Sequence, residues 1–164
     1  MVNESLLIGL AEVAIAFAGF SGVVAALSGN TNWSEADRFR FTNLLLISIA
    51  AAFFSFLPMI VDSYGFDEAQ NRLLVSALLA TFSIVLFVNR ALKGLNIRRK
   101  FGELNTIVAS VFAFSLTTIF AAQIVGYFHP EIAAATYVSG VLMLILLAAT
   151  QFVYLVLDSL ASKG

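Results

Sequence analysis

Residues 131–157 have the sequence EIAAATYVSGVLMLILLAATQFVYLVL, and after Glu131 this run contains no charged side chain. A transmembrane helix needs about 20 predominantly apolar residues, because that length crosses the hydrocarbon core of a bilayer. Four further runs meet the same criterion, namely residues 5–28, 41–62, 72–93 and 104–128. Because a backbone in lipid must satisfy its own hydrogen bonds, each run is predicted to be a helix. The predicted fold is an all-α membrane bundle of five spans.

The composition also indicates that the chain lies in a lipid bilayer. Of the 164 residues, 60% are hydrophobic and 12% are charged, and the mean hydropathy is +0.95. Soluble domains are typically about 45–50% apolar and about 25% charged. A chain of this length forms one domain at most, and its polar residues are too few to coat a soluble core. Residues 1–164 are therefore predicted to form a single transmembrane domain.

The connectors between the runs differ in charge. The first carries Arg38 and Arg40, the second is acidic apart from Arg72, and the fourth has no Lys or Arg. The third carries a basic cluster that consists of Arg90, Arg98, Arg99 and Lys100. Because Lys and Arg accumulate in cytoplasmic loops, this pattern predicts an outside N-terminus and a cytoplasmic C-terminus. A four-span arrangement, with the first run re-entrant or interfacial, is the alternative.

The basic cluster has two interpretations. In the first, its side chains set the topology and reach out to the lipid headgroups. In the second, they bind anionic lipid or a second protein. The net charge of the chain is −1, so no overall charge favours a nucleic-acid partner.

Two other connectors show turn signals. The stretch Tyr64-Gly65-Phe66-Asp67-Glu68 predicts a compact turn, and Phe128-His129-Pro130-Glu131 predicts a tight hairpin. Proline is favoured in the first turn of a helix, so Pro130 is expected at the start of the fifth helix.

Glu12 is the only charged residue in the run 5–28. An acidic side chain at membrane depth costs about 2.5 kcal/mol or more. At 100° per residue, Ser5 and Gly19 share a narrow strip of the helix with Glu12. In one interpretation Glu12 is protonated or hydrogen-bonded to another span and holds the bundle together. In the other, Glu12, Gly19 and Ser5 line a cation or proton path, with Glu12 forming a ring in a homo-oligomer.

Small residues recur every four positions in the same run, at Ala14, Ala18, Gly22 and Ala26. This spacing lets helix backbones approach closely in membranes, so these residues are predicted to pack against other helices. The side chains that could pair with a polar group of another span are Asn43, Asn105, Gln123 and Gln151. A mildly polar stripe in the fifth run, which includes Thr136 and Gly140, favours helix packing over a water-filled cavity.

The sequence lacks the residues that several kinds of catalytic and metal-binding site require. One histidine and no cysteine leave no transition-metal site, and the sequence has no phosphate-binding glycine loop, nucleophile elbow or His-acid pair. We expect neither an enzyme nor a bound cofactor.

Two stretches of the chain are informative together, namely Ala18-Gly19-Phe20-Ser21-Gly22 and Trp33-Ser34-Glu35-Ala36-Asp37-Arg38-Phe39-Arg40. They resemble the corresponding region of a group of bacterial proteins. These are small, functionally uncharacterised integral membrane proteins with a glycine-rich first helix followed by a Trp and an Asp-Arg pair. The resemblance covers the first third of the chain. It implies a multi-pass protein of the bacterial inner membrane and transfers no activity or functional residue.

These observations favour a homo-oligomeric membrane pore or channel for a cation or proton, with the first run near the pore. The alternative is a non-conducting membrane scaffold or subunit that partners another protein. A small-solute transporter ranks third, because neither discontinuous helices nor duplicated halves are evident.

Overall fold

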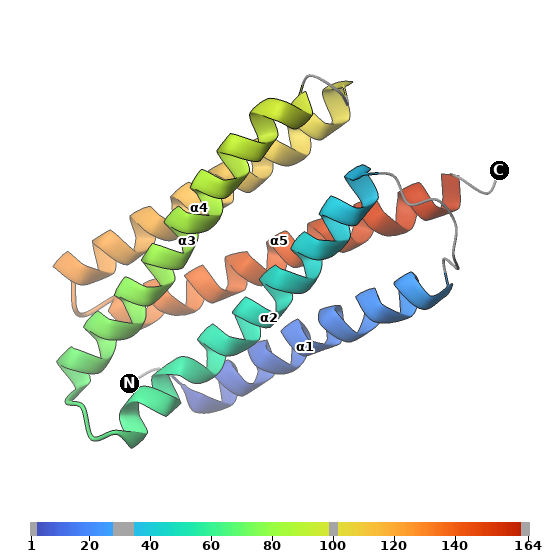
Figure 1. The fold of residues 1–164 in the computed structure, drawn as a ribbon. Coiled ribbons are helices and arrows are strands. Elements are labelled where there is room, and N and C mark those ends of the chain that lie inside the picture. The colour runs from blue at the N-terminus through green and yellow to red at the C-terminus, as the bar shows by residue number, and fades with distance from the viewer. Residues whose placement is uncertain (1–2, 28–34, 99–101, 162–164) are drawn as a thin grey trace. The chain divides into compact units, whose positions relative to one another are not determined.

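The computed structural model describes residues 3–27, 35–98 and 102–161, with the side chains of residues 3–26, 38–89 and 113–157. The described part of the chain is all-helical and contains no strand. Its helices are α1 (Glu4–Leu27), α2 (Glu35–Ser63), α3 (Glu68–Arg98), α4 (Gly102–Phe128) and α5 (Ala133–Ala161) (Figure 1). The predicted all-α class is confirmed.

Several helices run further than the apolar runs that predicted them, and α2 and α3 do so most. α2 begins at Glu35 instead of residue 41, and α3 continues to Arg98 instead of ending at residue 93. The end of an apolar run marks where the chain leaves hydrocarbon, whereas a backbone helix can continue into water for as long as its sequence allows it. Hydropathy therefore located these helices correctly but set some of their ends too early. The predicted connector Gly29–Ser34 lies outside the described residues.

The chain divides into two compact units. The α1 unit consists of Asn3–Leu57 and Leu144–Gly164, and the α4 unit contains Pro58–Met143. Both α2 and α5 contribute residues to each unit. In the α1 unit, the ring of Phe17 on α1 lies 6.0 Å from the ring of Phe152 on α5, in a tilted arrangement. In the α4 unit, α3 and α4 pack against each other as consecutive helices (Figure 1).

Each unit buries apolar side chains at helical spacing. In the α1 unit, the fully buried ones include Leu7, Ala11, Ala14, Leu44, Ile47, Ala51, Leu144 and Ala148. In the α4 unit they include Leu79, Leu116, Ile119, Tyr137 and Val141. The spacings i, i+3, i+4 and i+7 place these residues on one side of each helix.

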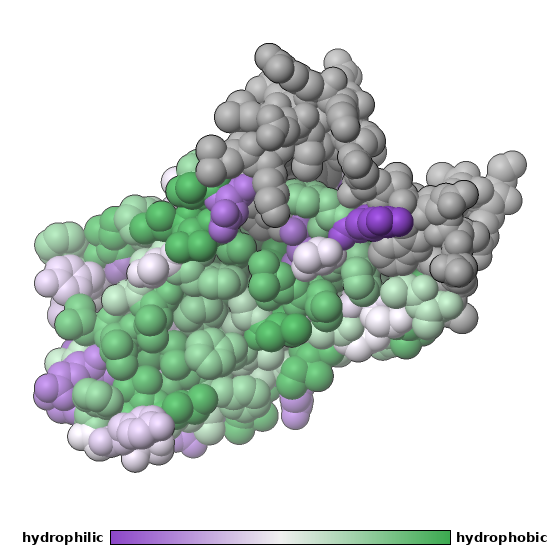
Figure 2. Space-filling model, in the orientation of Figure 1, coloured by the Kyte–Doolittle hydropathy of each residue, from purple (hydrophilic) through white to green (hydrophobic). Residues whose placement is uncertain are grey.

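The remaining surface is largely apolar. Every helix exposes large hydrophobic side chains, for example Ile15, Ile49, Val85, Phe114 and Leu146. Figure 2 shows a broad hydrophobic surface on one side of the molecule. Soluble monomers rarely expose large contiguous apolar patches, whereas such a surface suits contact with lipid.

Four helical segments are long and apolar enough to cross a membrane. They are Glu4–Ala26, Arg38–Ser63, Glu68–Asn89 and Ala133–Leu157. In α4, where the described side chains begin at Ala113, the segment Ala113–Phe128 forms a shorter apolar helix. The architecture fits a multi-pass membrane protein. The fifth span and the orientation of the termini stay predictions.

The connection between α2 and α3 is the predicted compact turn. The backbone N–H of Tyr64 donates to the carbonyl of Val61 (3.1 Å), and that of Gly65 donates to the carbonyl of Asp62 (3.0 Å). Gly65 has φ of 77°, a left-handed conformation that glycine adopts without strain. Gly65 therefore occupies the position of the turn that requires a left-handed backbone.

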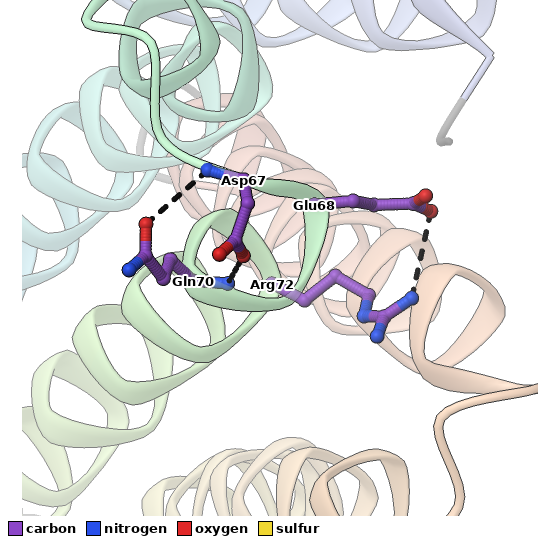
Figure 3. A network of polar contacts seen from close by, with 4 residues as sticks. All are labelled: Asp67, Glu68, Gln70 and Arg72. Atoms are coloured by element: carbon purple, nitrogen blue, oxygen red, sulfur yellow. Dashed lines mark hydrogen bonds and ion pairs between the residues drawn. The ribbon is translucent and has the colours of Figure 1, made fainter.

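Reciprocal hydrogen bonds begin α3 directly after this turn (Figure 3). The Asp67 carboxylate accepts from the backbone N–H of Gln70 (2.8 Å), and the Gln70 side-chain oxygen accepts from the backbone N–H of Asp67 (3.2 Å). This is a capping box, which satisfies two backbone donors that a helix start would otherwise leave free. The Asn71 amide also donates to the carbonyl of Pro58 (3.1 Å) and links the start of α3 to α2.

The start of the fifth helix differs from the prediction. Pro130 lies in a turn, and α5 begins at Ala133. The N–H groups of Ile132 and Ala133 donate to the carbonyls of His129 (3.1 Å) and Pro130 (3.4 Å), which are contacts three residues apart. Helical four-residue spacing begins only when Thr136 donates to the carbonyl of Ile132 (2.9 Å). The expected helix start at Pro130 was therefore wrong by three residues.

Candidate functional site

Ser5 lies in the first turn of α1, where Asn3 caps the helix. The Asn3 side-chain oxygen accepts hydrogen bonds from the backbone N–H of Ser5 (3.1 Å) and of Leu6 (3.4 Å). It also accepts from the Ser5 hydroxyl (2.7 Å). The hydroxyl proton of Ser5 is therefore used by the cap of its own helix, while its oxygen is still able to accept a hydrogen bond.

Glu12 is exposed on α1. It makes no hydrogen bond or ion pair within the described part of the chain. The helix begins at Glu4, so a rise of 1.5 Å per residue places Glu12 about 12 Å along it. If α1 starts at the membrane surface, the carboxyl group lies within the hydrocarbon core, which is about 30 Å thick.

The side of α1 that carries Glu12 is opposite the side that the chain buries. The buried side chains of this helix are Leu7, Ala11, Ala14 and Ser21. At 100° per residue, the centre of that group lies about 150° from Glu12 around the helix axis. Glu12 therefore faces away from the core of the α1 unit.

We call the side around Glu12 the open strip of α1. It consists of Ser5, Ile8, Gly9, Glu12, Ala16, Gly19, Val23 and Ala26, and all of them are exposed except Gly9, which is half-buried. A Cβ added to Gly9 or Gly19 would meet no atom within 4 Å. Ile8 and Val23 are the large apolar side chains of the strip. The three ion-path candidates Ser5, Glu12 and Gly19 thus share one uncovered surface.

The small-residue repeat of α1 is only partly covered. Ala14 is buried and Ala18 is half-buried, but Gly22 and Ala26 are exposed. Four residues turn a helix by 400°, so each step of the repeat moves about 40° around the axis and leaves the buried side. Within this chain, the repeat supports packing at its N-terminal half and leaves its C-terminal half open.

Gln123, one of the four side chains named above as possible partners for a polar group of another span, makes a polar contact between helices. Its side chain is 3% exposed, and its Nε2 donates to the backbone carbonyl of Thr136 on α5 (3.0 Å). Its Oε1 is buried and has no hydrogen-bond partner among the described residues. The contact joins α4 to the backbone of α5 within the α4 unit.

The other candidate polar partners differ from Gln123. Asn43 and Gln151 are buried, and the Asn43 Nδ2 has no hydrogen-bond partner. The side chain of Asn105 lies outside the described side chains, as do those of Arg90, Arg98, Arg99 and Lys100. The backbone of α3 continues as a helix through Arg98.

Two glycines allow α4 and α5 to approach closely. A Cβ on Gly126 would overlap the Thr136 hydroxyl and lie 3.2 Å from the Ala133 Cα. A Cβ on Gly140 would lie 2.9 Å from the Gln123 Nε2. The stripe that contains Thr136 and Gly140 therefore serves packing at these two positions. Gly126 was not predicted from the sequence, where its only signal is its small size near a predicted hairpin.

His129 and Glu131 pair in the α4–α5 connection, where both side chains are exposed. The His129 Nδ1 lies 3.1 Å from the Glu131 Oε1. A hydrogen bond from its own backbone lowers the pKa of Glu131, and the contact with His129 lowers it further. Exposed pairs of this kind contribute little to stability. The described residues contain no cluster of His, Cys, Asp and Glu that could hold a metal ion.

No protein-family model, curated protein or solved structure matches the chain.

Proposed function

We propose that the protein is a homo-oligomeric membrane pore for a cation or proton, in which the open strip of α1 from several copies surrounds the path. One observation carries this proposal. Glu12 lies exposed and without a partner in the described chain, opposite the buried side of α1, on a strip whose small residues Ala16 and Gly19 are not covered by any other described residue.

The energetic cost of an acidic group in lipid favours this arrangement. A carboxyl side chain that faces hydrocarbon costs about 2.5 kcal/mol or more. A water-filled path along the open strip removes that cost, because the carboxylate stays hydrated. Rings of acidic side chains also favour cations over anions in pores. The small side chains at Ala16 and Gly19 leave room for water or for a close neighbouring helix.

The direct test measures ion flux in liposomes. We expect the purified protein to carry potassium or proton current, and Glu12→Gln to reduce cation selectivity or current. If wild-type protein passes no current at any pH between 5 and 8 and Glu12→Gln changes nothing, the pore proposal fails.

The assembly is tested separately at Gly19. Because a Cβ there meets no atom within 4 Å, Gly19→Leu should leave the fold of the single chain intact. If the open strip is the interface, this variant should lose the oligomer or the current while keeping its helix content. Ala121→Leu is the matched control, because Ala121 is exposed on a different helix, α4. Equal effects of the two substitutions would contradict a role for the strip.

A non-conducting scaffold or subunit is the competing function, and the same uncovered surface would then bind a different protein. It predicts a chain that purifies as a monomer and needs a second membrane protein for stability. The basic cluster on the third connector would be a further contact for that partner. Monomeric protein with no flux would favour this alternative over the pore.

A further inference from the structure

Four exposed aromatic side chains gather at one end of the α4 unit. Tyr64 is 77% exposed, Phe66 44%, Tyr127 63% and Phe128 71%. The first two belong to the α2–α3 connection, and the last two end α4. These two connections lie at the same end of this unit, because α3 and α4 are consecutive packed helices that run in opposite directions (Figure 1).

Ionisable side chains flank these rings in the sequence. Asp62 lies in the last turn of α2, Asp67 in the α2–α3 connection and Glu68 at the start of α3, and the α4–α5 connection carries His129 and Glu131; all five are exposed. Apolar segments adjoin the rings, because Arg38–Ser63 ends one residue before Tyr64 and Ala113–Phe128 ends at Phe128. The four rings therefore lie at the boundary between apolar helical segments and exposed ionisable side chains.

We propose that Tyr64, Phe66, Tyr127 and Phe128 form an aromatic girdle that lies at the boundary between headgroups and hydrocarbon of a phospholipid bilayer. The girdle sets the depth of the α4 unit in the membrane. Aromatic rings favour this boundary because their apolar body enters the hydrocarbon edge, while a tyrosine hydroxyl reaches water or headgroups.

The neighbouring charges favour lipid over a protein as the occupant. The buried centre of a protein interface is depleted of charged residues, because each charge would lose its water. Here every ring lies within four residues of an exposed acidic side chain. The headgroup region stays hydrated, so it accepts the rings and the charges together.

The girdle predicts the depth of other residues. With Phe128 at the boundary, a rise of 1.5 Å per residue places Phe114 about 21 Å further along α4. The centre of the hydrocarbon core is about 15 Å from the boundary, so Phe114 lies about 6 Å past the bilayer centre and well inside the hydrocarbon. Phe114 is itself exposed, which makes it accessible to lipid in this unit.

The experiment places single tryptophans in a Trp33→Phe background. Tyr64→Trp and Phe128→Trp report on the girdle, and Phe114→Trp is the deep control. Each variant is reconstituted in phosphatidylcholine vesicles that contain lipids brominated at shallow or deep acyl positions. We expect Trp at 64 and 128 to be quenched most by shallow bromines, and Trp at 114 most by deep ones. Phe66→Trp and Tyr127→Trp replace any variant that loses helix content.

Three results would overturn the proposal. The first is stronger quenching of the girdle positions by deep bromines than by shallow ones. The second is quenching by aqueous iodide with no response to any brominated lipid, which would place the rings in water. The third is lipid quenching that rises steeply on dilution of the protein, which would mean that a second copy covers the rings. None of these measurements involves α1 or Glu12, so this proposal stands or falls separately from the pore.

Discussion

At the scale of single residues, the glycines fall into two groups according to the space around them. Gly9, Gly19 and Gly22 on α1 have no atom within 4 Å of an added Cβ, whereas Gly126 and Gly140 face the α4–α5 contact. In membranes, where lipid is as apolar as the helices, close packing of this kind is a main source of helix association. The two groups therefore predict different responses to the same substitution.

Gly126→Ala should destabilise the protein by about 1–3 kcal/mol, as is typical when a side chain is forced into a well-packed contact. The added Cβ would overlap the Thr136 hydroxyl, which donates to the Ala133 carbonyl (2.9 Å) and is held in place. Unfolding in mixed detergent micelles measures the loss. Gly19→Ala is the control and should be neutral or slightly stabilising, because alanine favours helix over glycine. Equal stability of the two variants would show that the close α4–α5 contact does not form.

Part of the candidate site was evident from the sequence at this scale. Glu12 was identifiable because a charge in an apolar run is conspicuous, and Gln123 was identifiable as an amide in another run. The partner of Gln123 was not predictable, because it is the backbone carbonyl of Thr136, and any residue supplies a carbonyl. Gly126 was missed because a glycine in an apolar run has no distinguishing neighbour until the hairpin is folded.

At the scale of the elements, the capping box at the start of α3 is the best defined local structure of the described connections. Asp67→Ala removes the side-chain acceptor for the Gln70 N–H and should cost about 1 kcal/mol of stability. Asp62→Ala, in the last turn of α2, is the control, since only the backbone carbonyl of Asp62 accepts a hydrogen bond from the turn. Thermal or denaturant unfolding followed by circular dichroism distinguishes them. A smaller loss for Asp67→Ala than for Asp62→Ala would contradict the cap.

The elements were more predictable than their ends. Each of the five apolar runs became a helix, because hydrophobic length alone decides which segments can occupy lipid. The start of α5 was misplaced because Pro130 is compatible with a turn as well as with a first helical residue. Which side of α1 is buried was not predictable either: its large residues Val13 and Phe20 are exposed, and small Ala11 and Ala14 are buried.

At the scale of the whole molecule, the distribution of Lys and Arg makes a prediction about topology. The chain has no cysteine, so single-cysteine variants report on one position at a time without further substitutions. Asp62→Cys and Glu131→Cys should react with a membrane-impermeant maleimide added outside intact cells, because both residues are exposed in connections predicted to lie outside. Lys93→Cys and Lys163→Cys should react only after the membrane is opened, since basic connectors stay in the cytoplasm. Labelling of Lys163→Cys from outside, with Lys93→Cys still protected, would mean an odd number of spans after the third connector and would reject the five-span topology. Labelling of Lys93→Cys from outside would reverse the orientation and place the aromatic girdle on the cytoplasmic face, without moving it from the boundary.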